Sequence, residues 1–505
     1  MKQILLLAFL ALSSLGFSQK IKLKVTGQKD TTVFLIKYYG KNLLYADTAE
    51  MKNGLVEFNG AKQKPGIVGL LLPGQKYFEF IYNNEEVQLE TAGPDFVGNM
   101  KVKKSAENTI FIDYIQYINK ERSKANELSS KREAMKRTDA GYKGLTAELD
   151  SISKKVVAYQ ANLVETNKDK LVSKIVKMSM DIKIPEAPRN ADGSMKDSSF
   201  AYHYFRDHYF DNIDLKDDRL VNTSIFHTKL DYFFSDKMLL QQPDTIVKYA
   251  YRFCDQLNQK SEMFKYAVIH ITSTFEKSKI MCMEKVFVKM GERYYCSKNA
   301  EGKSPAYWMT DDKLKELCDK VNTEKFLVCG EKAINISLRD TTDVNWKDFY
   351  SLKAEYTILY FWESDCGHCK KSTPKLQKLY EEKLKARNVE VFAVSKAIDD
   401  HFGKWKKFIK DNKLTFINVA LTDKLFKEAT ADAAKFVPKY TTLESLNYQR
   451  TYDVVTTPRV FILDKDKKII GKGLSIAQLE DFMDKLQGVK DAKKVVEPDP
   501  EDVGH

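Results

Sequence analysis

The stretch FWESDCGHCKKSTPKL at residues 361–376 determines the fold expected for the C-terminal third of this chain. Its two cysteines, Cys366 and Cys369, follow the apolar run YTILYF and open a segment with a helical pattern. Zinc sites use the same spacing but need a second matching pair, and Cys318 and Cys329 have ten residues between them. The motif therefore predicts a strand-to-helix turn that carries two reactive thiols and no metal.

The start of a helix supplies the chemistry that such a pair needs. Unpaired N–H groups and the helix dipole stabilise negative charge on Cys366, and the thiolate is the attacking species in disulfide exchange. Cys369 lies one turn later on the same face, so it can attack a mixed disulfide and release the substrate. We expect His368 to add positive charge near the thiolate, although it could be a plain exposed histidine. Asp365 opposes the thiolate.

Two prolines strengthen this interpretation. Pro374 falls inside the expected helix, where it should cause a kink. Pro458 directly precedes the strand-like run RVFIL, a position that suits a cis peptide bond, although an ordinary trans proline fits there too. A cis turn packed against the cysteines would leave the backbone of Thr457 free to pair with an extended substrate.

The sequence around the motif alternates between strand and helix patterns. Strands are expected at 356–361, 388–395, 414–421, 459–463 and 468–471, and helices from Cys366 onward, at 402–410 and at 476–486. This alternation predicts an α/β domain over residues 329–488. Residues 489–505 are charged and contain proline, which predicts a disordered tail.

The motif FWESDCGHCKKSTPKL followed by TTPRVFILD resembles the thioredoxin superfamily, and most of all the exported TlpA/ResA-type thiol–disulfide oxidoreductases. The resemblance covers residues 330–487 and implies a redox-active Cys366–Cys369 disulfide, a cis Pro458 and no cofactor. The Gly-His dipeptide also resembles that of protein disulfide isomerases, whose sites tend to be more oxidising than that of thioredoxin. The residues expected to support the two cysteines are Gly367, His368, Trp362, Glu363, Thr457 and Pro458.

The chain departs from the thioredoxin pattern in two places. Thioredoxins carry a buried aspartate where this chain has Tyr360, which puts the proton route at the second cysteine in doubt. Glu363 is a candidate substitute, with an ordinary surface charge as the alternative. Asp365 stands where relatives often have tryptophan. The gap of about ninety residues between Cys369 and Pro458 suits family members with an extra strand–helix insertion.

Two further regions precede the expected thioredoxin-like domain. Residues 19–103 hold short β-branched and aromatic runs punctuated by Gly, Asn, Asp and Pro, which predicts a small all-β sandwich. Residues 104–328 show apolar residues at three- and four-residue steps, which predicts a mainly helical domain. Together they resemble uncharacterised domains that precede thioredoxin domains in bacterial envelope proteins, which names an architecture without an activity.

The N-terminus has the order of a secretory signal peptide. A lysine at position 2 precedes an apolar run that ends near Ser18, and the run is shorter than a membrane-spanning helix. We therefore expect cleavage of residues 1–18, no membrane span afterwards, and location in the periplasm or cell envelope, where disulfides persist. The formal charge is 82 − 70 = +12, but the lysines are interleaved with acids, so no nucleic-acid partner is expected.

Other candidate sites are weaker. His203, His208 and Asp207 do not share one helical face, so they are interpreted as structural, and the aromatic residues between 202 and 234 as core. Five further cysteines lie scattered through helical sequence, and a structural disulfide could form among the last three, with the pairing open. These cysteines are Cys254, Cys282, Cys296, Cys318 and Cys329.

Two hypotheses for function follow. In the first, the chain is an enzyme that exchanges disulfides with cysteine-containing envelope proteins, and a redox partner recycles its active site; the direction of electron flow is open. In the second, the first two regions bind an envelope polymer or protein, and the thioredoxin fold is an accessory module. A thiol peroxidase is disfavoured because such enzymes need Thr-x-x-Cys, and Glu363 occupies the threonine position.

Overall fold

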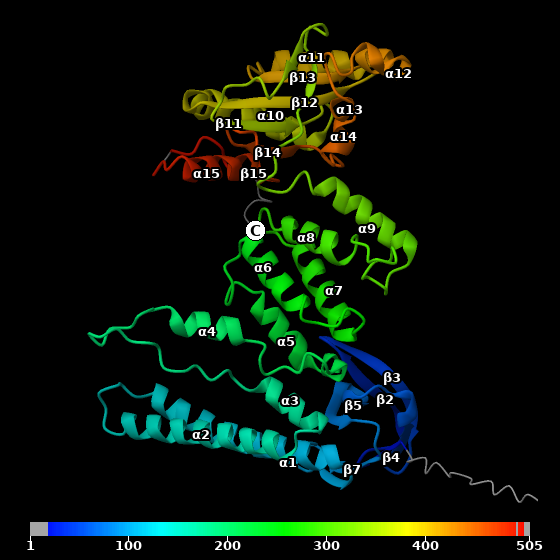
Figure 1. Ribbon diagram of the computed structural model, residues 1–505, viewed down its shortest axis with the longest axis vertical. Helices are drawn as coiled ribbons and strands as arrows, with labels where there is room; N and C mark the ends of the chain where they lie inside the picture. The colour runs from blue at the N-terminus through cyan, green and yellow to red at the C-terminus, as the bar shows by residue number, and fades with distance from the viewer. Residues whose placement is uncertain (1–18, 491–492, 499–505) are drawn as a thin grey trace, which may run out of the picture. The chain divides into compact units, whose positions relative to one another are not determined.

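The computed structural model describes residues 19–490 and 493–498 (Figure 1). The chain divides into two compact units. One holds the residues up to Leu240 together with Phe253–Ala267, and the other holds Gln241–Arg252 and the residues from Val268 onward. The expected signal peptide lies outside the described residues. Within the described part of the chain, no helix combines the length and hydrophobicity needed to cross a membrane.

The first unit begins with two four-stranded sheets, ordered β4-β1-β7-β8 and β3-β2-β5-β6, which confirms the expected small all-β domain. The strands are β1 (Lys20–Thr26), β2 (Thr31–Tyr39), β3 (Asn42–Met51), β4 (Leu55–Asn59), β5 (Gly66–Leu72), β6 (Lys76–Tyr82), β7 (Val87–Ala92) and β8 (Lys101–Lys104). In β1 the alternate residues Ile21, Leu23 and Val25 are buried, as the two-residue period of a strand requires.

A helical region follows, which confirms the mainly helical domain expected after the β domain. Its helices are α1 (Ala106–Glu133), α2 (Tyr142–Thr166), α3 (Leu171–Ser179), α4 (Phe200–His208), α5 (Ser224–Phe233), α6 (Pro243–Cys254), α7 (Glu262–Glu276), α8 (Glu284–Tyr294) and α9 (Asp311–Glu324). Phe210 packs between Phe233 and Phe253, with ring centroids 4.6 and 4.2 Å away, so this part of the aromatic run forms core. Tyr202 and Tyr232 are 44% and 41% exposed, so the interpretation as core is wrong for these two residues. His203 and His208 pair with different carboxylates.

The second unit contains a seven-stranded sheet ordered β10-β9-β13-β12-β11-β14-β15. Strands β11, β12 and β13 are parallel, and the others are antiparallel to their neighbours. Its elements are β9 (Ser337–Asp340), β10 (Trp346–Asp348), β11 (Tyr356–Phe361), α10 (Gly367–Leu379), β12 (Val389–Ala397), α11 (His401–Asp411), β13 (Ile417–Thr422), α12 (Asp423–Ala431), α13 (Leu443–Leu446), α14 (Tyr448–Thr451), β14 (Arg459–Leu463), β15 (Ile469–Lys472) and α15 (Ile476–Leu486). The predicted strands and helices are all present, whereas β9, β10 and α12–α14 were not predicted.

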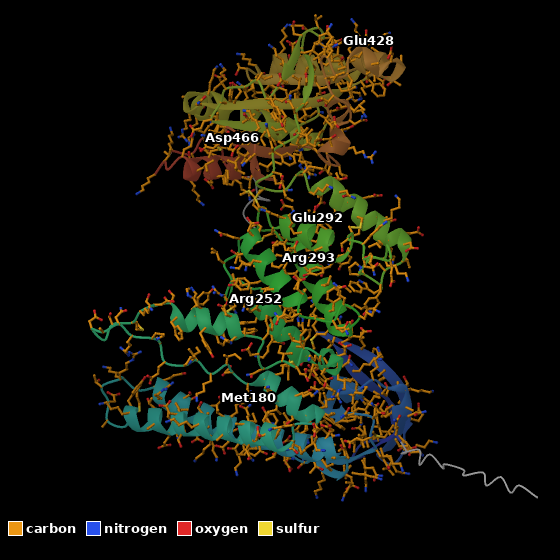
Figure 2. The ribbon with its side chains drawn as sticks, viewed as in Figure 1. Met180, Arg252, Glu292, Arg293, Glu428 and Asp466 are labelled. Atoms are coloured by element: carbon orange, nitrogen blue, oxygen red, sulfur yellow. A yellow bond between two sulfur atoms is a disulfide. The ribbon has the colours of Figure 1, made fainter. Side chains whose placement is uncertain are left out.

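The expected strands at 459–463 and 468–471 pair as a hairpin, in which the residues DKDK join β14 to β15. The Asp464 carboxylate accepts hydrogen bonds from the backbone N–H groups of Asp466, at 2.9 Å, and Lys468, at 2.8 Å. Figure 2 labels Asp466 among the side chains of this domain. A short carboxylate that bonds the backbone two and four residues later closes the turn, so local sequence is enough to specify this hairpin.

The sheet has an apolar layer on each face. Along β11, Ile358 and Tyr360 belong to one buried cluster, and Leu359 and Phe361 to the other. The first cluster continues through Trp362 and Cys369. Because successive strand residues point to opposite faces of a sheet, Ile358 and Tyr360 share one face. Cys369 packs in the cluster on that face, which is the face that α10 covers.

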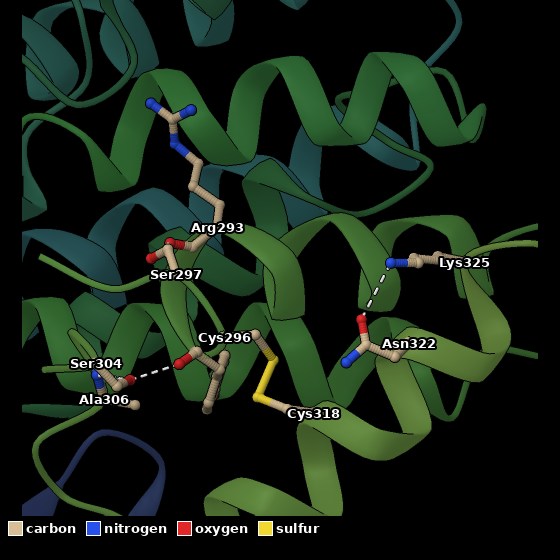
Figure 3. Close-up of a disulfide and its surroundings, with 9 residues drawn as sticks. Arg293, Cys296, Ser297, Ser304, Ala306, Cys318, Asn322 and Lys325 are labelled. Atoms are coloured by element: carbon tan, nitrogen blue, oxygen red, sulfur yellow. Dashed lines mark hydrogen bonds between the residues drawn. A yellow bond between two sulfur atoms is a disulfide. The ribbon is translucent and has the colours of Figure 1, made fainter. Parts of the chain in front are cut away.

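Two disulfides lie in the second unit, one nested within the other along the chain. Cys282 bonds Cys329. Cys296 bonds Cys318, and Figure 3 shows this second disulfide. Cys254 is a buried free thiol. The possible structural disulfide is therefore present, and the pairing left open by the sequence is resolved.

The C-terminal segment departs from the expected disordered tail over residues 493–498. The backbone N–H groups of Val495 and Val496 both bond the carboxylate of Glu480 on α15, at 2.9 Å each. Lys378 on α10 donates to the Val495 carbonyl at 3.2 Å, and the Val496 side chain is buried. Glu480 is only 1% exposed and needs donors, which explains why this charged segment is held.

Candidate functional site

Cys366 caps the N-terminus of α10. Its backbone is extended, with φ −65° and ψ 124°, so the chain leaves β11, turns and enters the helix immediately after it. The Cys366 sulfur accepts a hydrogen bond from the backbone N–H of Cys369 at 3.4 Å. The first turn of a helix has N–H groups without partners in the helix, and here one of them points at sulfur. Pro374 lies inside α10, as expected.

The surroundings of Cys366 favour its thiolate. Burial raises the pKa, but hydrogen bonds from the Thr457 side chain, from Cys369 and from the backbone N–H of His368 outweigh it. The net result is a Cys366 pKa below its ordinary value. The Cys366 side chain remains partly exposed, so a substrate sulfur can reach it.

Cys369 has the opposite character. Its side chain is fully buried, and burial raises the pKa of its thiol to about 12. A backbone hydrogen bond from Glu363 opposes this rise without cancelling it. Both cysteines are free thiols in the structure. Of the two thiols, Cys366 is therefore the one whose surroundings favour the thiolate.

Thr457, the residue before Pro458, lies against the first thiol. The Thr457–Pro458 peptide bond is cis, as the resemblance implies. The Cys366 thiol donates a hydrogen bond to the Thr457 carbonyl at 3.3 Å. The expectation that the Thr457 backbone is free for substrate therefore needs correction for its carbonyl. That carbonyl is engaged while Cys366 is protonated, and loss of the thiol proton removes the donor.

Tyr360 occupies the place of the missing aspartate. Its hydroxyl lies 2.9 Å from the hydroxyl of Thr373 on α10, and both side chains are fully buried. Burial raises the pKa of Tyr360 far above its ordinary value, so it stays neutral at physiological pH. The hydroxyls of Tyr360 and Thr373 are therefore neutral polar groups near the two thiols, and neither is an anionic base.

The remaining predicted residues contribute mainly through backbone and packing. The Glu363 carbonyl accepts from the Cys366 N–H at 3.3 Å. Burial, and then the charge of the Glu363 carboxylate, raise the pKa of Tyr448. Trp362 is buried against Phe408 of α11, with ring centroids 5.2 Å apart. Gly367 and His368 are exposed. A Cβ added at Gly367 would meet no atom within 4 Å, so space for a partner is open there.

One residue near the site was not found from the sequence. His401, the first residue of α11, lies with Nδ1 3.0 Å from the Asp365 carboxylate. The two positions are 36 residues apart, so no local spacing connects them. Only the packing of α11 onto the domain brings them together.

Across the described residues, no group of three or more His, Cys, Asp or Glu side chains is arranged to hold a metal ion. The site consists of two thiols of unequal pKa, helix N–H groups and the threonine before a cis proline. This arrangement can form and break a disulfide.

Comparison with known families divides the chain into three matched stretches. Residues 329–472 match the AhpC/TSA family. Residues 19–111 and 145–304 match two families described only as domains of unknown function, DUF4369 and DUF5106. These matches confirm uncharacterised domains ahead of a thioredoxin-like domain.

Individual relatives match different shares of the chain. The thiol-disulfide oxidoreductase ResA of Bacillus thuringiensis subsp. konkukian is 28% identical over 168 residues, which cover 32% of this chain and 81% of the relative. A solved domain of a possible thiol-disulfide isomerase from Cytophaga hutchinsonii is 31% identical over 32% of this chain and 94% of its own, with a TM-score of 0.25. A thioredoxin-like protein from Bacteroides caccae is 15% identical, covers 60% of this chain and 98% of its own, and has a TM-score of 0.39.

Proposed function

We propose that this chain, whose residues 329–472 form a thioredoxin-like domain of the AhpC/TSA family, exchanges disulfides with protein thiols outside the cytoplasm through Cys366 and Cys369. Its relatives are thiol–disulfide oxidoreductases of the thioredoxin fold. The observation that carries the proposal is the contrast between a partly exposed Cys366 of lowered pKa and a buried Cys369 of raised pKa at the start of one helix.

In the reducing direction, the Cys366 thiolate attacks one sulfur of a substrate disulfide. The substrate S–S bond breaks, a mixed disulfide with Cys366 forms, and the substrate's second sulfur leaves as a thiolate that takes up a proton. Cys369 then loses its proton and attacks the Cys366 sulfur, which releases the substrate's first sulfur as a thiol. The substrate gains two electrons, and the enzyme is left with a Cys366–Cys369 disulfide.

A second dithiol must return the enzyme to its starting state. A redox partner attacks the Cys366–Cys369 disulfide in the same manner and becomes oxidised itself. Run in reverse, the same steps donate a disulfide to a substrate dithiol. The reduction potential of the pair relative to its partners decides the direction.

Two features support a location outside the cytoplasm. The N-terminal sequence has the order of a signal peptide, and the disulfides Cys282–Cys329 and Cys296–Cys318 are of the kind that persists in oxidising compartments. The substrates we propose are cysteine-containing proteins of the cell envelope.

Insulin reduction with dithiothreitol as electron donor tests the activity. The full chain should accelerate reduction, and Cys366→Ser should abolish the acceleration, because Cys369, the other thiol of the site, is buried and has a raised pKa. Cys254→Ala is the matched control, since it removes a free thiol outside the site and should leave the rate unchanged. A chain without activity, or a Cys366→Ser variant with full activity, would refute the proposal.

Trapping identifies the substrates. In Cys369→Ala the resolving thiol is absent, so mixed disulfides should accumulate on Cys366 and be released by reductant. The double variant Cys366→Ser, Cys369→Ala should trap nothing. Recovery of no disulfide-linked protein from envelope extracts would favour the alternative, in which the preceding regions bind a partner and the redox domain is accessory.

A further inference from the structure

The turn before the attacking thiol carries an acidic side chain, Asp365, which pairs with a histidine. Asp365 directly precedes Cys366, and a carboxylate in that position disfavours a neighbouring thiolate. Its Oδ2 lies 3.0 Å from Nδ1 of His401 at the start of α11. The two side chains are 43% and 41% exposed, so the pair is reached by solvent but is not fully hydrated.

The packing of α11 fixes this pair in place. Trp405, one turn after His401, is buried in the apolar cluster that contains Cys369. Phe408, a further turn along, packs on Trp362 at 5.2 Å. Since Trp362 and Asp365 lie at the two ends of the same short turn, α11 contacts that turn at both ends. His401 is therefore held against the carboxylate by a buried helix face.

The other charged groups around His401 form a short alternating row. Its Nε2 lies 3.6 Å from the carboxylate of Asp400, and Lys404 pairs with the other oxygen of Asp400 at 2.7 Å. Lys404 also interacts electrostatically with Asp365. Two basic side chains of α11, His401 and Lys404, thus interact with Asp365, the acid directly before Cys366.

We infer that His401 is a positioning residue for the redox site: it binds the Asp365 carboxylate and offsets its charge, which keeps Cys366 ionisable despite the acid beside it. This inference rests on the proposed function and assigns a role to a residue outside the Cys-x-x-Cys motif. The ring can donate from Nδ1 in its neutral form, and the protonated form adds a full positive charge. Because both groups are partly solvated, the effect is expected to be modest.

A double-mutant cycle read on Cys366 tests the inference. The variants are His401→Gln, Asp365→Asn and both together, and the readout is the pH midpoint of Cys366 alkylation, followed by mass spectrometry of its peptide in the reduced full chain. His401→Gln should raise the midpoint and slow alkylation about two- to four-fold on the acidic limb, which corresponds to a few tenths of a pKa unit. Asp365→Asn should lower the midpoint, and in that background His401→Gln should have no further effect.

Two controls separate charge from structure. His401→Lys places a positive charge at this position and should restore most of the wild-type profile. His208→Gln removes another histidine of 41% exposure that pairs with an aspartate, Asp211, and should leave the profile unchanged. The inference fails if His401→Gln has no effect, if its effect is the same with and without Asp365, or if His208→Gln matches it.

The outcome is distinct from that of the proposed function. The cycle compares midpoints between variants, so it can be read whatever the absolute reactivity of wild-type Cys366. An active wild-type enzyme with an unchanged His401→Gln profile would overturn only this inference, whereas an inactive enzyme would overturn the proposed exchange reaction.

Discussion

Cys366 and Cys369 stand beside each other as free thiols, whereas Cys296 and Cys318, 22 positions apart, are joined in a disulfide. The first cysteine of each pair lies at a different end of a helix. Cys366 caps the N-terminus of α10, where N–H groups stabilise a thiolate. Cys296 lies just beyond the C-terminus of α8, and its own N–H bonds back to the Gly291 carbonyl at 2.9 Å. The same side chain is thus suited to exchange at one helix end and to cross-linking at the other.

The largest expected effect concerns the two free thiols themselves. With the pKa of Cys366 below its ordinary value and that of Cys369 at about 12, their thiolate fractions at pH 8 should differ on the order of 1,000-fold. Cys366 reactivity should fall tenfold per pH unit once the pH drops below its pKa, while Cys369 should stay unreactive to pH 10. Iodoacetamide labelling with peptide mass spectrometry measures both rates. Equal labelling rates for Cys366 and Cys369 would contradict the predicted difference between their pKa values.

Removal of the other cysteine pair should affect stability rather than exchange. The disulfide Cys296–Cys318 closes a loop of 22 residues, so its replacement by two serines should lower the free energy of unfolding by about 3 kcal/mol. Thermal unfolding without reductant measures this loss. Insulin reduction at 25 °C should stay within about two-fold of wild type. Loss of activity in a variant that is still folded would show that this disulfide also serves the redox site.

A smaller effect is expected from substitutions of Thr457, which test what lowers the pKa of Cys366. Its side chain lowers the pKa of both thiols, so Thr457→Val should raise the Cys366 pKa and slow alkylation at pH 7 about three- to ten-fold. Thr457→Ser keeps the hydroxyl and should behave like wild type. An unchanged alkylation profile in Thr457→Val would assign the lowered pKa to the helix N–H groups alone.

The smallest expected effect concerns the position of the missing acid. Tyr360→Phe keeps the buried ring but leaves the Thr373 hydroxyl without its partner, which should cost about 1 kcal/mol of stability. Denaturant titration measures that change, and release of a trapped substrate by Cys369 should keep its rate. A tenfold slower release would instead give the tyrosine hydroxyl a part in proton transfer.

Sequence reasoning reached the features that are local along the chain. Strand β14 (Arg459–Leu463) and helix α15 (Ile476–Leu486) have the predicted bounds, because a short continuous apolar run defines the strand and a capping serine begins the helix. The position of Cys366 at a helix start was also local.

Features that depend on distant segments were not accessible in the same way. The pairings Cys282–Cys329 and Cys296–Cys318 depend on how α8 and α9 pack, and spacing alone left them open. His401 meets Asp365 only because α11 buries its apolar face. The short edge strands β9 and β10 carry little periodicity, so no pattern marked them.

The segment at residues 493–498 has a practical consequence for dissecting the chain. A redox module excised at residue 488, where the α/β pattern ends, would leave Glu480 without two amide donors and uncover the slot that Val496 fills. Such a fragment would be prone to self-association, and its behaviour in solution would misrepresent the intact protein. Fragments intended for potentiometry or crystallisation should extend through Pro498.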